Sequence, residues 1–171
     1  MRRLRSAAVL TLIMAVRVAG AASASAAGFY DPPSDLKGAF AGAPPADLAA
    51  VAKNLDGHYA AAFLLFAVAS MNYAYPGLDI PSLLNDKGRQ VQAQVETECT
   101  ADGLIKPAFT QTKDLTADGR PITDYLGEQP YAAAVAEQRT GLRKPAAPVL
   151  VAHSVADDIV PYAQGLAMPR S

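Results

Sequence analysis

The feature that most constrains the fold is a short apolar run near the end of the chain, Val149 to Ala152. Pro145 and Pro148 precede it, and its length and β-branched content are typical of a strand buried on both faces of a parallel sheet. The polar turn that follows holds four side chains able to do chemistry: His153, Ser154, Asp157 and Asp158. The sequence therefore predicts one buried strand that leads into an acidic turn.

The acid lies where an open α/β sheet would place a catalytic group. Such sheets keep their functional side chains just past the carboxyl ends of the strands. An acid in that position commonly orients a histidine, which in turn activates a serine. Asp157 is the candidate for this role, with Asp158 as its neighbour.

The same segment has a competing interpretation as a nucleophile turn around Ser154. Ala152 and Ala156 would then occupy the two positions that must be small. Such a turn needs a helix directly after the serine, and the residues from Asp157 to Pro161 are a poor helix start. We therefore expect Ser154 to be a turn residue and His153 to be a turn or packing residue.

The first 26 residues have the pattern of a secretory signal peptide. A basic n-region precedes the apolar stretch Ala7–Val16, and small-x-small cleavage sites end at Ala24 and Ala26. The apolar stretch is shorter than a bilayer span, which disfavours a membrane anchor. We expect a secreted, extracellular protein.

The net charge of the chain without its first 26 residues disfavours some classes of partner. Four of the 15 basic residues and none of the 16 acidic ones are lost, which leaves a formal net charge of −5. A negative chain is a poor ligand for nucleic acid or anionic membranes. Since the two histidines show no metal-ligand spacing and no Gly-rich phosphate loop follows a strand, we expect no metal and no cofactor.

Residues 46–140 have a helical hydrophobic pattern. The predicted helices span residues 46–55, 59–75, 80–84, 86–102, 122–126 and 131–139. Asn85 is the expected N-cap and Gly103 the expected C-cap of the 86–102 helix. The 59–75 helix is apolar nearly all round, which favours burial in a core over contact with a lipid. Residues 38–45, rich in Gly, Ala and Pro, are expected to form a linker or a junction.

Cys99 is the only cysteine and falls on the inward face of the 86–102 helix. Burial as a small apolar side chain is its default state. In a secreted chain a lost disulfide partner and an intermolecular bond remain alternatives.

Three blocks of the chain together resemble the secretory lipase family. Phe29–Pro33 is similar to the family's mature N-terminus, Pro45–Asp102 to its helical cap, and Gly141–Ala163 to the stretch that carries its catalytic acid. The resemblance implies an α/β-hydrolase fold that cleaves triacylglycerols and related esters in lipid catabolism. This chain would be mostly α, with one or two orphan core strands.

The resemblance also implies site residues and partners. It makes Asp157 the triad acid and Phe63, Leu65 and Phe66 of the cap substrate-contacting residues. The partners would be a lipid or ester substrate and, transiently, a lipid surface. The expected organisation is signal peptide (1–26), extended segment and junction (27–45), helical cap-like region (46–140) and core fragment with the acid turn (141–171).

The chain also departs from the family pattern. Ser34–Pro44 stands where most of the hydrolase core would lie, and the sequence stops at Ser171, before the family's histidine. The nucleophilic serine, that histidine and the usual cap cysteine partner have no counterpart. We therefore expect an internally deleted, truncated and catalytically incomplete copy. The alternatives are a secreted helical module that binds lipid or a partner, and a non-functional gene fragment.

Overall fold

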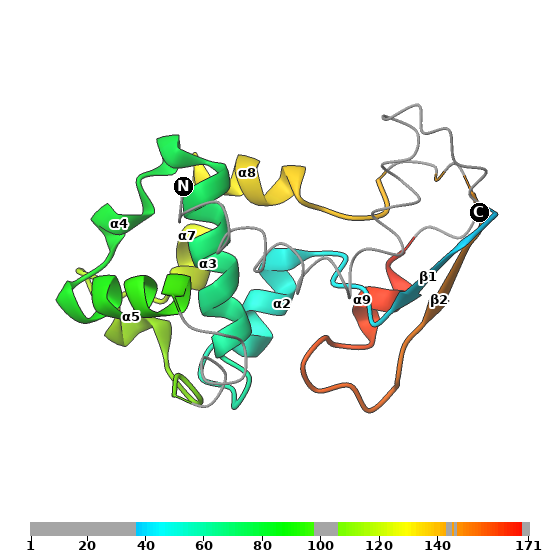
Figure 1. The fold of residues 1–171 in the computed structure, drawn as a ribbon, viewed down its shortest axis with the longest axis horizontal. Helices are drawn as coiled ribbons and strands as arrows, with labels where there is room; N and C mark the ends of the chain where they lie inside the picture. Colours follow the sequence, from blue (N-terminus) through cyan, green and yellow to red (C-terminus); the bar gives the residue numbers. More distant parts are fainter. Residues whose placement is uncertain (1–36, 98–105, 143–144, 146, 169–171) are drawn as a thin grey trace. The chain divides into compact units, whose positions relative to one another are not determined.

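A computed structural model of the chain describes residues 37–97, 106–142, 145 and 147–168 (Figure 1). This part of the chain divides into two compact units. The first, called the helical unit, spans Ala52–Glu137. The second, called the strand unit, contains the described residues of Leu12–Val51 and Gln138–Ser171. Helix α2 (Leu48–Leu55) belongs to the strand unit at its start and to the helical unit at its end.

The helical unit is built around α3 (Ala62–Ala74), the apolar helix that the sequence predicts for residues 59–75. It packs on α5 (Asp86–Thr97). The core cluster consists of Ala62, Leu65, Phe66, Ala69, Val95 and Leu115, with Phe63 and Val91 packed against it. Burial of this helix is therefore confirmed. It begins later than predicted because residues 56–61 form turns.

The remaining elements of the helical unit are short. They are η1 (Pro76–Leu78), α4 (Ile80–Leu83), η2 (Thr112–Asp114), α7 (Ile122–Tyr125) and α8 (Tyr131–Glu137). Helices α4, α7 and α8 lie where the hydrophobic pattern predicts them. The 3-10 turn η2 lies in a stretch for which the sequence predicts only a loop.

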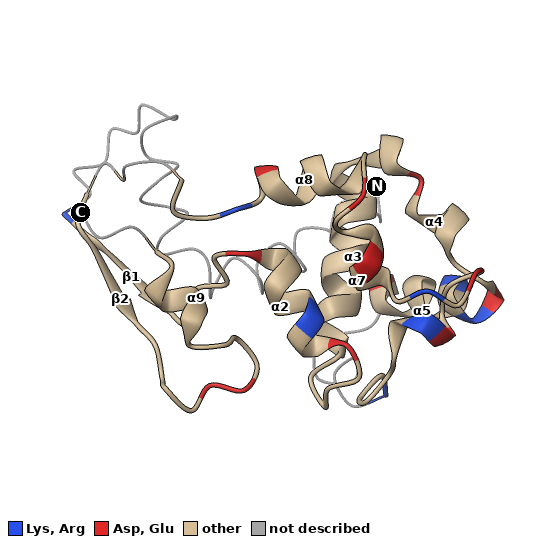
Figure 2. Cartoon of the chain, turned by 180° about the vertical axis from the view of Figure 1, so that it is seen from behind, with Lys and Arg blue, Asp and Glu red and all other residues tan. Residues whose placement is uncertain are grey.

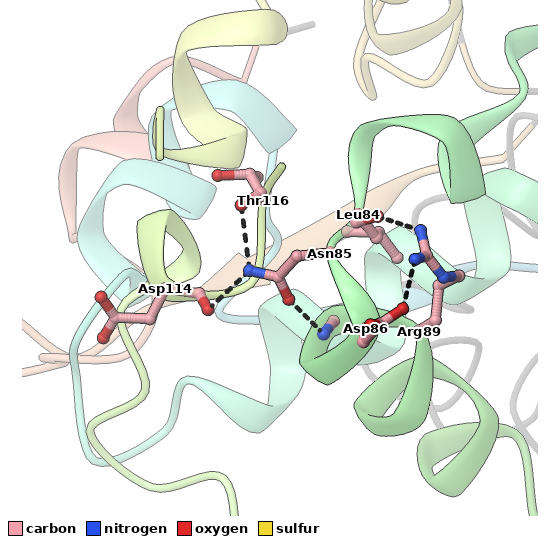
Figure 3. Close-up of polar contacts among 7 residues, drawn as sticks. Leu84, Asn85, Asp86, Arg89, Asp114 and Thr116 are labelled. Carbon is pink, nitrogen blue, oxygen red and sulfur yellow. Dashed lines mark hydrogen bonds and ion pairs between the residues drawn. The ribbon is translucent and has the colours of Figure 1, made fainter. Parts of the chain in front are cut away.

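Asn85 caps α5 and also joins it to a distant loop (Figure 3). Its Oδ1 accepts the Gly88 N–H at 2.9 Å, as expected for an N-cap. Its Nδ2 donates to the carbonyl oxygens of Asp114 and Thr116 at 3.1 and 3.0 Å. The prediction of Asn85 as an N-cap is confirmed, and the same side chain fixes the start of α5 against the loop after η2.

A part-buried carboxylate–hydroxyl pair ties the end of α2 to η2 within the helical unit. Oδ1 and Oδ2 of Asp56 accept the N–H and the hydroxyl of Thr112 at 2.7 and 2.8 Å. The Thr112 oxygen in turn accepts the Ile122 N–H at 2.9 Å. Thr112 is almost fully buried, so the Ile122 N–H would lose its partner without replacement by water if the threonine hydroxyl were removed.

The strand unit contains a parallel pair, β1 (Ala39–Gly42) and β2 (Val149–Ala152), in which Ala39 lies opposite Val149 and Gly42 opposite Ala152. The predicted strand is confirmed with its predicted bounds. Of the two expectations for residues 38–45, the linker is wrong because four of those residues form β1, and the junction stays a prediction. The expected burial on both faces is also wrong, because Phe40 and Leu150 are 59% and 66% exposed.

Hydrogen bonds between distant segments hold the strand unit together. Buried Gln164, in the short helix α9 (Ala163–Leu166), accepts the Asp47 N–H through its side-chain oxygen at 2.7 Å. The Thr140 N–H donates to the Ala46 carbonyl at 3.2 Å. These bonds fix the segment after β1 to both segments that flank β2. Helix α9 has no counterpart among the predicted elements.

Several predictions fall outside the described residues. These are the signal peptide, the N-terminal block Phe29–Pro33, Cys99 and the Gly103 cap. Among the helices that the structure does describe, none combines the length and the apolar character that crossing a membrane requires.

Gly88 provides a test of the helical packing. A Cβ built there would lie 2.1 Å from the Leu115 carbonyl oxygen, so Gly88→Ala must push α5 away from the backbone that Asn85 also contacts. We expect the variant to lose about 2 kcal/mol of stability. Urea unfolding followed by circular dichroism measures the loss.

Gly77→Ala is the matched control, because nothing lies within 4 Å of a Cβ at Gly77. It should change the stability by less than about 0.5 kcal/mol. A Gly88→Ala protein as stable as this control would contradict the described packing of α5.

Candidate functional site

The candidate site is the connection between β2 and α9, residues 153–162, which consists of turns (Figure 1). The connection leaves the carboxyl end of a parallel strand. In α/β proteins that edge of the sheet is where catalytic side chains gather. The sequence therefore placed the acidic turn at the correct end of a strand.

Asp157 is held by the backbone of its own turn. Its Oδ1 accepts the N–H groups of Ile159 and Val160 at 3.0 and 2.9 Å. Hydrogen bonds from backbone amides to a carboxylate are among the stronger ones in proteins, because the acceptor is charged. The side chain is 18% exposed, and none of the described Lys or Arg residues forms an ion pair with it. The turn thus fixes one oxygen and leaves Oδ2 without a backbone donor.

His153 also forms a hydrogen bond within this turn, to a backbone carbonyl. Its Nε2 lies 2.8 Å from the Val160 carbonyl oxygen. A carbonyl can only accept, so Nε2 must carry the proton. The residue whose amide binds Asp157 therefore has its carbonyl bound by His153. Oδ2 of Asp157 lies 3.6 Å from the same Nε2, which is too long for a hydrogen bond.

The imidazole of His153 is packed tightly by the residues that follow the turn. Its side chain is only 3% exposed and meets the ring of Tyr162 edge-on, with the centroids 5.7 Å apart. A Cβ at Gly165 in α9 would come within 2.5 Å of Nδ1, so only glycine allows this approach. Nδ1 is buried and has no hydrogen-bond partner in the described part of the chain.

Ser154 does not form a nucleophile turn. Its Oγ accepts the Ala156 N–H at 3.1 Å, and the residues after it form turns instead of a helix. No hydrogen bond joins Ser154 to His153 among the described residues, and the Nε2 proton of His153 is committed to a carbonyl. The expectation that Ser154 is a turn residue and His153 a packing residue is confirmed.

The three candidate substrate-contacting residues all lie on α3 in the helical unit. Leu65 and Phe66 are part of its core cluster, and Phe63 packs against that cluster. Leu65 also lines a small apolar recess together with Val91 and Leu115, with room for about one water molecule. These three side chains thus belong to the hydrophobic core of the helical unit. Their contact with a substrate stays a prediction.

Some residues that shape the site carry no recognisable sequence signal. Tyr162 and Gly165 enclose His153, but a lone aromatic and a lone glycine in a four-residue helix have no periodicity to mark them. The hydrogen bond from His153 to Val160 uses a backbone carbonyl, which any residue would supply. Only the order of strand, histidine and aspartate is visible in the sequence.

Comparison with known proteins places the chain in a family. A model of the family described as "Secretory lipase" matches residues 15–170. The "Probable inactive lipase MT1628" of Mycobacterium tuberculosis (strain CDC 1551 / Oshkosh) is 31% identical over 145 residues, which cover 84% of this chain and 32% of that protein.

Solved structures agree with this match. Candida antarctica lipase A superimposes with a TM-score of 0.73, and its closed state with 0.72, each at 27% identity over 83% of this chain and 35% of theirs. The chain thus spans about a third of the length of the relatives it matches. With the acid turn at the end of a parallel strand and this breadth of match, the chain belongs to the secretory lipase family.

Proposed function

We propose that this chain carries the catalytic acid and the helical cap of a secreted hydrolase of lipid carboxylic esters. We further propose that its 171 residues do not hydrolyse esters by themselves. The observation that carries the proposal is the geometry of Asp157: two backbone amides fix its Oδ1, while no backbone N–H of the described residues binds Oδ2. In this proposal residues 46–140 act as the cap and residues 141–171 belong to the hydrolase core.

The acid of a catalytic triad needs an oxygen that no backbone amide of its own turn binds. That acid accepts the Nδ1–H of a histidine, keeps the ring in the productive tautomer and stabilises the imidazolium that forms when the serine loses its proton. The fixed Oδ1 removes rotational freedom from the carboxylate, so Oδ2 would meet such a histidine without reorganisation.

The residues of the turn do not supply the other two groups. His153 has its Nε2–H on the Val160 carbonyl, and Ser154 accepts a backbone amide within its own turn. Triad members act as a unit, so an acid without nucleophile and base gives almost no rate enhancement. The name of the mycobacterial relative, a probable inactive lipase, agrees with a chain of this kind.

The alternative is a free helical module that binds lipid. It requires the apolar side chains of α3 to lie at a surface. Leu64, Leu65 and Phe66 are buried inside the helical unit. No specific observation now favours this alternative.

The first test is an esterase assay of residues 27–171 with a short-chain p-nitrophenyl ester. We expect no turnover above the buffer blank for the unmodified chain, and the same result for Asp157→Ala, because neither protein has a nucleophile paired with a base. Turnover that disappears in Asp157→Ala would contradict the proposal. Ser154→Ala is the control for the nucleophile-turn interpretation, and hydrolysis that it abolishes would establish that interpretation instead.

We also propose that the chain is exported and that its first 26 residues are removed. The family is one of secretory lipases, and the basic, apolar and small-x-small regions follow in the order of a signal peptide. Expression of the full chain in a secreting bacterial host should give a product in the medium that begins at Ala27, or at Ser25 if the first of the two sites is used, by mass spectrometry.

Ala24→Leu should block this processing, because Ala24 is a small-residue position of both overlapping cleavage sites. Ser25→Leu is the matched control, since it fills the middle position of the second site, which need not be small. An Ala24→Leu chain cleaved as efficiently as the control would argue against these sites.

A further inference from the structure

The burial of His153 leaves one nitrogen of its imidazole unsatisfied. Nδ1 is buried and has no hydrogen-bond partner in the part of the chain that the structure describes. Gly165 closes the space beside it, since a Cβ at Gly165 would lie 2.5 Å from Nδ1. A buried acceptor without a donor lowers the stability of the fold, and an apolar side chain of similar size would avoid that loss. Packing alone therefore does not account for a histidine at this position.

What the histidine adds is one hydrogen bond to a residue that binds the acid. Its Nε2–H donates to the Val160 carbonyl oxygen at 2.8 Å. The N–H of Val160 donates to Oδ1 of Asp157 at 2.9 Å. Val160 is thus held through its carbonyl by the histidine while its amide holds the carboxylate. A loss of the first bond would free the backbone that supplies the second.

The surroundings of the imidazole keep its donor on this one acceptor. The side chain is only 3% exposed, and the ring of Tyr162 meets it edge-on. With Gly165 on the Nδ1 side, the ring has no room to turn. The connection between β2 and α9 contains acidic but no basic residues (Figure 2). Within this connection, N–H groups and not cations therefore orient Asp157.

We propose that His153 is a positioning residue for the acid. Its Nε2–H holds Val160, and through Val160 it keeps Oδ1 of Asp157 on the amide and so sets the direction of Oδ2. The inference rests on the proposed function in one respect, namely that Asp157 is a catalytic acid. The role requires a fixed N–H donor and no transfer of a proton. A side chain that donates but does not titrate, such as glutamine, should therefore replace this histidine.

The experiment follows Val160 by NMR in labelled residues 27–171. His153→Gln places an amide N–H near the position of Nε2, and His153→Leu has a similar size but no donor. The Val160 carbonyl carbon should keep its chemical shift in the glutamine variant and move upfield in the leucine variant. The Val160 amide should exchange about tenfold or more faster in the leucine variant alone. Ser154→Ala is the matched control, because it removes only the side-chain bond to the Ala156 N–H in the same turn.

Two results of this comparison would overturn the inference. If His153→Gln and His153→Leu change the Val160 signals equally, the turn needs the shape of the imidazole and not its donor. If neither variant changes them, the bond to the carbonyl does not position Val160. The esterase assay is read separately. Turnover that Asp157→Ala abolishes contradicts the proposed function, whereas failure of the glutamine replacement contradicts only the role of His153.

Gly165→Ala tests the same link while the donor is kept, and it decides the matter if His153→Leu does not fold. The new Cβ should displace the imidazole and shift the Val160 and Ile159 amides. In a His153→Ala background the ring is absent, so the same substitution should have a much smaller effect on these amides. Equal effects in both backgrounds would show that Gly165 acts on the turn without the imidazole, and would overturn the inference.

Discussion

The interaction on which the site depends is the pair of backbone hydrogen bonds to one oxygen of Asp157. Each bond to a charged acceptor contributes about 1.5–3 kcal/mol. Together they convert a flexible carboxylate into a fixed one. His153 then binds the carbonyl of Val160, so the residue that donates to the acid is itself held in place. In the proposed function this fixed acid would meet a histidine other than His153, because the Nε2–H of His153 is already bound to the Val160 carbonyl.

The two units are stabilised by different interactions. The helical unit has a buried core cluster around α3 and joins its loops through Asn85, Asp56 and Thr112. The strand unit has two four-residue strands and leaves Phe40 and Leu150 in solvent. A two-stranded sheet is rarely stable alone, so its order depends on bonds such as that of Gln164 to the Asp47 amide. The described part of the helical unit is thus stabilised by a buried core, and that of the strand unit by hydrogen bonds between distant segments.

The sequence predicted the elements whose signals are local. Val149–Ala152 was found from its β-branched run between prolines and a turn, and Asn85 from its position before an amphipathic segment. β1 was missed because alanine and glycine have low strand propensity and its partner lies more than a hundred residues away. In the site, the acid was recognisable from its place after the strand. The contacts of His153 with Val160, Tyr162 and Gly165 were not, since they depend on how the chain returns after the turn.

The most direct test of the account is the NMR chemical shift of the amide protons in the turn. In Asp157→Ala the amide protons of Ile159 and Val160 should move strongly upfield and exchange faster, because they lose a charged acceptor. The amide of Ala156, which binds Ser154 in the same turn, should stay in place. Unchanged shifts at Ile159 and Val160 would show that the carboxylate is not held by its turn and would contradict Asp157 as a prepared catalytic acid.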